Sequence, residues 1–197
     1  MGRPRLHDRT TAAALLDAAE RIIESEGVEA LTVRRVAQEI SATTRAVYSS
    51  LGSKQALISG LGVRAFDLLG EMVKALPLTE DPADDLVTAG VSGFRAWALG
   101  HPALFRLGVQ CTDVPTEAHP DIGAAAERSL VALHHRLHRL QQDGGLGARS
   151  LALATLEFHA TCEGLAAIEL RHPFQPEDGL YIWTDTLRSL IAGWRES

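Results

Sequence analysis

Apolar residues recur every three or four positions along most of the chain, which is the spacing of an α-helix buried on one side. The first such stripe covers residues 10–26, and Gly27 follows it as a favourable helix end. A longer stripe begins after Ser53, a good N-cap, and stops at Pro77, which cannot continue a helix. No segment alternates apolar and polar residues as a strand would, so the pattern predicts an all-α protein.

Five further helices are predicted in the C-terminal part of the chain. Asp81 and Pro82 suit the N-cap and the first position of a helix, and glycines or prolines separate the segments that follow. The predicted segments are residues 81–100, 102–109, 118–142, 149–170 and 180–194. Together with the N-terminal segments, the pattern predicts about nine helices.

Between residues 31 and 57 the pattern predicts two short amphipathic helices separated by a tight polar turn. Thr32 would cap the first helix, at residues 33–39, and the polar turn at residues 41–44 would cap the second, which ends near Ser50. A helix of about two turns is unstable alone, so its neighbours must hold it. A short helix displayed on another, with polar and basic groups outward, is the helix-turn-helix arrangement that fits a DNA major groove.

A set of residues in this segment also matches a family pattern: Val36-Ala37, Thr43, Val47-Tyr48 and the run from Leu51 to Leu57, in which Lys54 stands six residues after Tyr48. The segment resembles the DNA-binding domain of the TetR-type transcriptional regulators. The resemblance implies a three-helix helix-turn-helix DNA-binding domain at residues 1–55. A long helix would join it to a C-terminal helical domain, residues 56–197, that binds a ligand and forms a dimer.

The chain departs from the family pattern at three places. Ser41 occupies a turn position where glycine is usual, and with a positive φ it would cost about 1 kcal/mol. Arg45-Ala46 replaces the usual Gly-Thr, and Ser50-Leu51 replaces the commoner His-Phe. The fold prediction survives these changes, whereas the operator sequence cannot be carried over.

Candidate DNA contacts come from both helices of the motif and from the segments that flank them. We expect Arg45 to read a base, because a guanidinium can donate two hydrogen bonds to guanine O6 and N7; a phosphate contact is the alternative. By the resemblance, Tyr48 donates its hydroxyl to a phosphate, and Lys54 meets a phosphate beside free backbone N–H groups. The polar arm at residues 1–8 could enter a minor groove or be a disordered tail. The predicted set is Arg3, Arg5, Thr32, Arg34, Arg35, Thr43, Thr44, Arg45, Tyr48 and Lys54.

The net charge of -6 does not exclude DNA binding, because the charge is unevenly distributed. Residues 1–60 carry eight Lys/Arg and seven Asp/Glu, whereas residues 61–197 carry eleven and eighteen. Charges further apart than about 10 Å are largely screened, so a local basic patch matters more than the total.

The remaining composition predicts a cytoplasmic protein without metal or cofactor. Hydrophobic residues make up 46% and charged residues 22%, and neither a membrane-length apolar run nor the apolar core of a signal peptide is evident. Cys111 and Cys162 lack CxxC spacing, and a third ligand is not in view beside His134 and His138. A Gly-rich phosphate loop, a nucleophile elbow and a paired-carboxylate motif are also missing from the sequence, which argues against an enzyme.

A ligand pocket is expected inside the C-terminal helical bundle. Its candidates are mostly aromatic and apolar, which favours a mainly apolar small molecule; the alternative is that most of them are core residues. His159 and Glu163, at i and i+4, could give the ligand a polar handle or pair with each other, and Gly90 and Gly93 leave space for a ligand or for a neighbouring helix. The predicted pocket residues are Phe66, Phe94, Trp97, Phe105, Val109, Cys111, Phe158, His159, Cys162 and Glu163.

The last two predicted helices are apolar around much of their surface and therefore need burial on more than one side. The resemblance implies that two such helix pairs form a four-helix dimer interface; the alternative is that they complete a monomer core. The predicted interface residues are Leu151, Leu156, Leu165, Ile168, Trp183, Leu187, Leu190, Ile191 and Trp194.

These observations favour a homodimeric, ligand-responsive transcriptional repressor that binds a palindromic operator in double-stranded DNA. The alternatives are a helical-bundle enzyme using His159 and Glu163, and a transcriptional activator with the same fold. The sequence does not identify the effector, the operator or the regulated gene.

Overall fold

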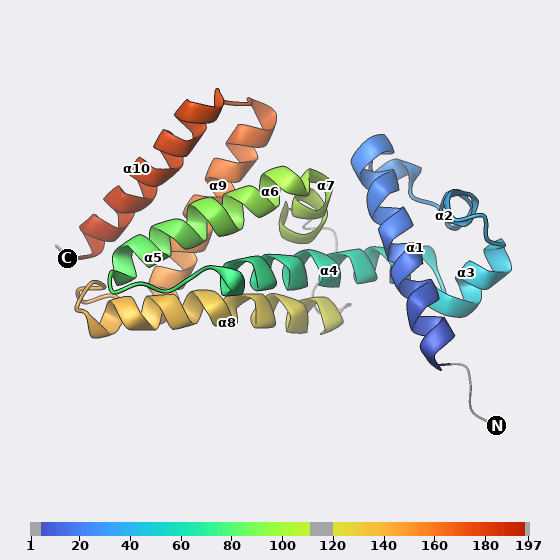
Figure 1. The fold of residues 1–197 in the computed structure, drawn as a ribbon, viewed down its shortest axis with the longest axis horizontal. Helices are drawn as coiled ribbons and strands as arrows, with labels where there is room; N and C mark the ends of the chain where they lie inside the picture. The colour runs from blue at the N-terminus through green and yellow to red at the C-terminus, as the bar shows by residue number, and fades with distance from the viewer. Residues whose placement is uncertain (1–4, 111–119, 196–197) are drawn as a thin grey trace. The chain divides into compact units, whose positions relative to one another are not determined.

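The structure is a computed structural model that describes residues 5–110 and 120–195. All regular secondary structure in these ranges is helical, as predicted (Figure 1). The elements are α1 (Arg5–Glu26), η1 (Val28–Ala30), α2 (Val33–Glu39), α3 (Thr44–Leu51), α4 (Lys54–Ala75), α5 (Pro82–Thr88), η2 (Ala89–Arg95), α6 (Ala96–Gly100), α7 (Pro102–Phe105), η3 (Arg106–Gln110), α8 (Pro120–Gln142), α9 (Leu151–Arg171) and α10 (Pro176–Arg195).

The helices form two compact units. Unit 1 comprises residues 1–65 and 101–125, and unit 2 comprises residues 66–100 and 126–197. The first half of α4 belongs to unit 1 and the second half to unit 2, so the division falls inside one continuous helix. The domain boundary expected at residue 55 lies near the start of the same helix.

The core of unit 1 is built on α1, which packs against α2 and α3. Leu15, Ala19 and Ile22 of α1 are buried, and Val36 and Val47 are buried on the two helices that it supports. The 3.6-residue spacing of the sequence thus selects the buried face of α1 correctly.

Polar contacts fix the start of α7 on α1, within unit 1. Glu20 of α1 accepts a hydrogen bond from Arg64 at 3.0 Å, and its other oxygen lies 3.1 Å from His101 Nδ1. Glu24 accepts a hydrogen bond from the backbone N–H of Ala103 at 2.9 Å, which satisfies a free donor in the first turn of α7. The apolar spacing gave no indication of these contacts between distant segments.

In unit 2, α5, η2 and α6 follow one another as a single rod from Pro82 to Gly100. Asp81 caps the rod by accepting hydrogen bonds from the backbone N–H groups of Ala83 and Asp84 at 2.9 and 3.0 Å. A Cβ atom added at Gly90 would overlap the Leu187 side chain of α10. This glycine therefore provides close helix packing rather than space for a ligand.

Two tryptophans of α10 donate to two glutamates of α9. Trp183 Nε1 bonds to Glu169 at 2.7 Å, and the same carboxylate accepts hydrogen bonds from Arg95 Nε and Nη2 at 3.0 and 2.7 Å. Trp194 Nε1 bonds to Glu157 at 2.6 Å, and Arg149 donates to this carboxylate at 3.1 Å. Paired hydrogen bonds of this kind satisfy buried polar groups and fix the register of the two helices.

Two helices begin earlier than predicted. α1 begins at Arg5, so residues 5–8 are helical rather than part of an extended arm. α10 begins at Pro176, four residues before the predicted start. At the N-terminus the sequence interpretation treated Pro4 as unfavourable for a helix. α10 has Pro176 as its first residue, where the missing N–H of proline costs nothing.

α9 meets the length and hydropathy criteria for a membrane-spanning helix, with 21 residues and a mean hydropathy of 1.2. The sequence interpretation overlooked this property. The helix carries Glu157 and Glu169, which bind partners from other segments of unit 2. One such helix in a helical bundle is weak evidence for a membrane protein, because core helices of bundles meet the same criteria.

Candidate nucleic-acid interface and ligand cavity

α2 supports the candidate reading surface and begins as the sequence predicts. Thr32 caps it by accepting a hydrogen bond from the backbone N–H of Arg35 at 3.1 Å, and Val33, Val36 and Ala37 form its buried face. The hydroxyl of Thr32 is thus engaged in the cap, which reduces its value as a candidate DNA contact.

Arg34 and Arg35 differ in whether their side chains are free to contact DNA. Arg35 donates to Glu26 at 2.6 Å and to Glu39 at 2.8 Å. These hydrogen bonds raise the pKa of Arg35, and the bond from Arg35 lowers the pKa of Glu39. Arg35 therefore orders α2 against the end of α1, whereas Arg34 is exposed and faces solvent.

The turn between α2 and α3 has a left-handed residue at Ser41, with φ of 53°. Ser41 is the one residue other than glycine with positive φ in the described part of the chain. An L-residue there brings its Cβ close to the backbone, which glycine avoids. The departure from the family pattern at this position therefore has a structural cost.

We expect Ser41→Gly to raise the free energy of unfolding by about 1 kcal/mol, because glycine relieves the strain of positive φ. Urea denaturation checks this value. The control is Ser49→Gly, which places glycine at an exposed position inside α3 and should lower stability by about 0.5–1 kcal/mol. A loss of stability in both variants would show that the turn at Ser41 is not strained.

α3 displays the candidate recognition residues. Thr43 caps it by accepting a hydrogen bond from the backbone N–H of Ala46 at 3.2 Å, and Val47 is buried beneath it. Thr44, Arg45 and Tyr48 are exposed, and Tyr48 presents 56% of its surface to solvent. Tyr48 therefore does not serve mainly as a core residue, and its exposed ring is free to contact a partner.

The N-terminus of α4 follows α3 closely. Gly52 ends α3 with φ of 84°, and Ser53 Oγ accepts a hydrogen bond from the backbone N–H of Ala56 at 3.1 Å. Lys54 is the first helical residue and is exposed. Its ammonium group thus lies at a helix N-terminus, where the dipole and free N–H groups favour an anion such as phosphate.

The side chains of the predicted N-terminal arm, residues 1–8, lie outside the described part of the structure. Arg3 falls outside the described residues, and Arg5 is the first residue of α1, with a side chain that is likewise not described. Their contacts with DNA stay predictions.

A small internal cavity of about 30 Å³ lies in unit 2. Three predicted pocket residues, Phe94, Phe158 and His159, line it together with Leu69, Val73, Ala89, Ser129, Leu130 and Leu133, which the sequence interpretation did not select. The helical spacing of apolar residues could have placed Leu69, Val73, Leu130 and Leu133 on the inward sides of their helices. It could not show which cavity they line. A cavity of this size holds no more than a few water molecules.

His159 is the titratable side chain among the residues that line this cavity. Its ring packs edge-on against Phe94 with centroids 5.6 Å apart, and its Nε2 lies 3.8 Å from Glu163. Burial lowers the pKa of His159, so its neutral form predominates near neutral pH. A neutral imidazole can offer a ligand one donor and one acceptor.

The other predicted pocket residues are dispersed. Trp97 is buried and packs edge-on against Phe94, and Cys162 is buried nearby on α9; burial raises the pKa of its thiol. Phe66 and Glu163 do not line the cavity. Phe105 and Val109 belong to unit 1, and Cys111 lies outside the described residues.

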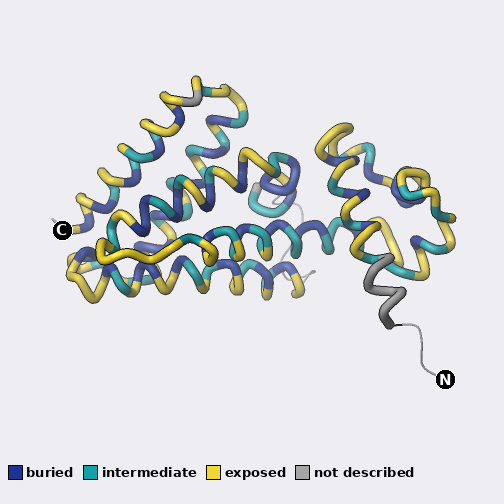
Figure 2. The backbone as a smooth tube through the Cα atoms, in the orientation of Figure 1, coloured by how far each residue is buried: buried dark blue, intermediate teal, exposed yellow. Residues whose placement is uncertain are grey.

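The predicted dimer residues fall into two classes of burial. Trp183, Leu187, Ile191 and Trp194 are almost completely buried within unit 2, so they fill the protomer's own core and cannot supply a contact surface as expected. Leu156 and Ile168 are 64% and 43% exposed, and Leu151, Leu165 and Leu190 are half-buried. Further exposed apolar residues on α9 and α10 are Leu153, Leu180 and Tyr181. Figure 2 shows that exposed and buried stretches alternate along α10.

Two family models match the chain. The model of bacterial regulatory proteins of the tetR family matches residues 15–61, and the tetracyclin repressor-like C-terminal domain matches residues 87–190. The second match alone covers more than half of the chain. The chain belongs to the TetR family.

A curated relative and two solved structures are similar to this TetR-family chain. The nicotine-responsive transcriptional repressor HdnoR of Paenarthrobacter nicotinovorans is 33% identical over 72 residues, which span 36% of each protein. A Rhodococcus sp. RHA1 protein of unknown function has a TM-score of 0.77 at 20% identity, covering 90% of this chain and 93% of its own. The TetR-family regulator PfmR of Thermus thermophilus has a TM-score of 0.69 at 19% identity, covering 89% and 97%. The structural matches establish the TetR fold.

Membership of the TetR family makes the protein a DNA-binding transcriptional regulator rather than an enzyme. The alternative of a helical-bundle enzyme that uses His159 and Glu163 is therefore rejected. His134, His135 and His138 are exposed on α8, and within residues 5–110 and 120–195 they belong to no group of three or more metal-ligating side chains.

Proposed function

We propose that this TetR-family regulator is a homodimeric repressor that binds an inverted-repeat operator and is released by a small, mainly apolar effector. The observation that carries the proposal is the exposed surface of α3, where Thr44, Arg45 and Tyr48 project beside Lys54 at the start of α4. A short, capped helix with an exposed arginine suits insertion into a major groove.

The dimer in this proposal rests on the surface chemistry of α9. The exposed apolar residues Leu153, Leu156 and Ile168 favour contact with a second copy, because a large apolar surface on one helix pair is unfavourable in water. A homodimer would present two reading surfaces to two half-sites about one helical turn apart. Since the target is operator DNA, we expect a cytoplasmic protein.

Effector release is proposed as a shift between two conformations. The internal cavity is too small for an effector, so the described state would correspond to the form without ligand. In a second conformation the cavity would be wider. An effector with a higher affinity for the wide conformation than for the narrow one would shift the population toward the wide conformation. α4 belongs to both units and would carry the change. HdnoR is named as a nicotine-responsive repressor, which supports repression and ligand response here but not the identity of the effector.

We expect Arg45→Ala to relax the preference for one base pair in each half-site, with a loss of about 1–3 kcal/mol in discrimination. Fluorescence anisotropy with operator duplexes substituted at each position measures this loss. Gln55→Ala, an exposed change outside α3, serves as the control and should keep the full preference. An unchanged preference in Arg45→Ala would assign this side chain to a phosphate contact or to no contact.

We expect Lys54→Ala to weaken binding to all duplexes by a similar factor and to reduce the salt slope of log K by about 1, because it removes one phosphate contact. Lys74→Ala removes an exposed lysine from the other end of the same helix and should leave binding unchanged. Equal effects of the two variants would mean that Lys54 acts only through net charge. Operator-linked reporter transcription, higher without the protein, would separate repression from the alternative of activation.

A further inference from the structure

A groove of about 790 Å³ lies between α8 and the second half of α4, within unit 2. The two helices run in the same direction (Figure 1). They approach closely at Gly70, where an added Cβ would lie 2.9 Å from the Cα of Ser129. The volume of the groove is within the range of about 300–1,000 Å³ that small-molecule sites occupy. It is thus much larger than the internal cavity of the same unit.

One side of the groove is apolar. Leu76 and Leu78, both in the segment that follows α4, line it together with Val131 of α8. Val131 is 65% exposed and Leu78 is 44% exposed, so neither side chain is covered by the protomer. Apolar side chains that line a groove of this size can take up the apolar part of a ligand.

The charges that line the groove do not balance. Asp67 is paired with Arg128 at 2.8 Å, and Glu71 is paired with Lys74 at 3.1 Å. Arg136 lines the same groove and forms no ion pair with any carboxylate in the described part of the chain. Although unit 2 lies in the acidic part of the sequence, this groove has an excess of positive charge.

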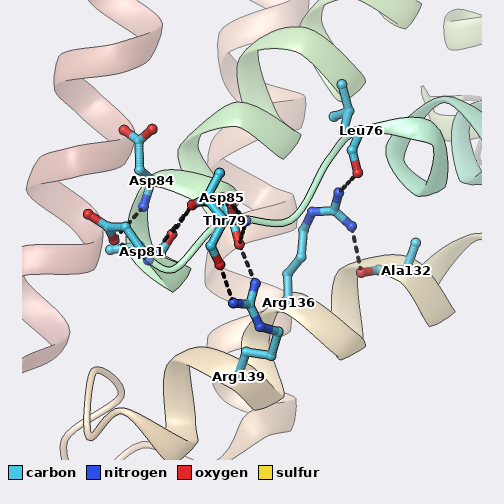
Figure 3. A network of polar contacts seen from close by, with 9 residues as sticks. Leu76, Thr79, Asp81, Asp84, Asp85, Ala132, Arg136 and Arg139 are labelled. Carbon is cyan, nitrogen blue, oxygen red and sulfur yellow. Dashed lines mark hydrogen bonds and ion pairs between the residues drawn. The ribbon is translucent and has the colours of Figure 1, made fainter.

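Arg136 is almost completely buried, at 3% exposure, and its bonds are incomplete. Nη2 donates to the carbonyl of Leu76 at 2.8 Å, and Nη1 donates to the carbonyl of Ala132 at 3.5 Å, which is the outer limit of a hydrogen bond (Figure 3). Nε has no hydrogen-bond partner among residues 5–110 and 120–195. A guanidinium carries five N–H donors, so most of its capacity to bind an anion remains.

Asp85 acts on Arg136 through its charge, but its hydrogen bonds go to other residues. Asp85 accepts hydrogen bonds from the hydroxyl and the backbone N–H of Thr79, both at 2.8 Å, and it is also bonded to Arg139 (Figure 3). Burial raises the pKa of Asp85, but the bonds from Thr79 and Arg139 outweigh burial and lower it overall. Burial lowers the pKa of Arg136; the charge of Asp85 offsets part of this effect, and the charge of Arg139 adds to it. A buried arginine next to a second arginine is stabilised by a further anion.

We propose that the groove between α4 and α8 binds a small amphipathic anion, whose carboxylate bonds to Arg136 and whose apolar chain lies along Leu76, Leu78 and Val131. The carboxylate replaces the weak bond to the Ala132 carbonyl, since a charged acceptor is the stronger partner for a guanidinium. This site is distinct from the internal cavity, and its existence does not depend on DNA binding or on the proposed effector.

Isothermal titration of the full-length protein with decanoate, below its micelle concentration, tests the proposal, with decanol as the uncharged probe of equal chain length. We expect decanoate to bind at least about tenfold more tightly than decanol, because only decanoate has a charged group for Arg136. Equal affinities for the two probes, or no binding of decanoate, would overturn the proposal.

Three variants locate the site. Val131→Glu adds a negative charge at an exposed position in the groove and should weaken decanoate binding by at least about tenfold. Gln141→Glu adds the same charge at an exposed position of α8 outside the groove and should change it less than about twofold. Arg136→Gln should remove the preference for decanoate over decanol. If the Arg136 variant does not fold, Val131→Glu alone tests whether decanoate binds in the groove. Unchanged binding in Val131→Glu would place decanoate elsewhere and contradict the proposal.

Discussion

Glu169→Gln is expected to lower the free energy of unfolding by about 3 kcal/mol, because it leaves the Arg95 guanidinium, whose side chain is only 18% exposed, without its counter-charge. Glu169 is 5% exposed and accepts hydrogen bonds from Arg95 and Trp183, so solvent cannot replace the lost charge. Urea denaturation at one fixed protein concentration measures the change, since stability of an oligomer depends on concentration.

The matched control is Glu157→Gln, which alters the second Trp–Glu–Arg arrangement of the same helices. Glu157 is 30% exposed, and its partner Arg149 is 25% exposed, so water screens this pair more effectively. We expect a loss of about 1 kcal/mol or less for this variant. Similar losses in the two variants would mean that burial does not determine how much the Glu169–Arg95 pair contributes to the free energy of unfolding.

Leu156→Glu is expected to convert a dimer to a monomer at micromolar protein concentration, with a loss of at least about 3 kcal/mol in association energy. Leu156 is 64% exposed on α9, and under the proposed interface a second copy covers it and would have to bury the new carboxylate. Sedimentation velocity measures the change in mass.

Leu99→Glu is the control for this prediction, because Leu99 is exposed on α6 rather than on the proposed interface. It should remain dimeric, and both variants should keep wild-type helical content, since neither side chain belongs to the core. A dimer that survives Leu156→Glu would move the interface away from this part of α9.

The local structure of the reading surface could be predicted from the sequence, because it depends on neighbouring residues. Thr32 and Ser53 cap the helices that they were expected to cap, and Thr43, from the polar turn expected to cap α3, does so. The strain suspected at Ser41 is present as a positive φ. Caps and turns are decided within about four residues, so the sequence contains the necessary information.

Packing partners could not be predicted in the same way. The apolar spacing of α10 identified Trp183 and Trp194 as residues that need burial, but it could not distinguish the protomer core from a dimer interface. The roles of Glu169 and Arg136 depend on Arg95 and on the Leu76 carbonyl, which are distant in the sequence. The cavity beside Phe94 and His159 likewise depends on how several helices meet.

The central claim is that this TetR-family protein reads an inverted repeat as a dimer. Selection of bound DNA from a random duplex library, at two salt concentrations, tests it most directly. We expect enrichment of one inverted repeat and binding that weakens steeply with salt. Absence of an enriched repeat at low salt, with protein that has been unfolded and refolded to remove any bound ligand, would contradict it.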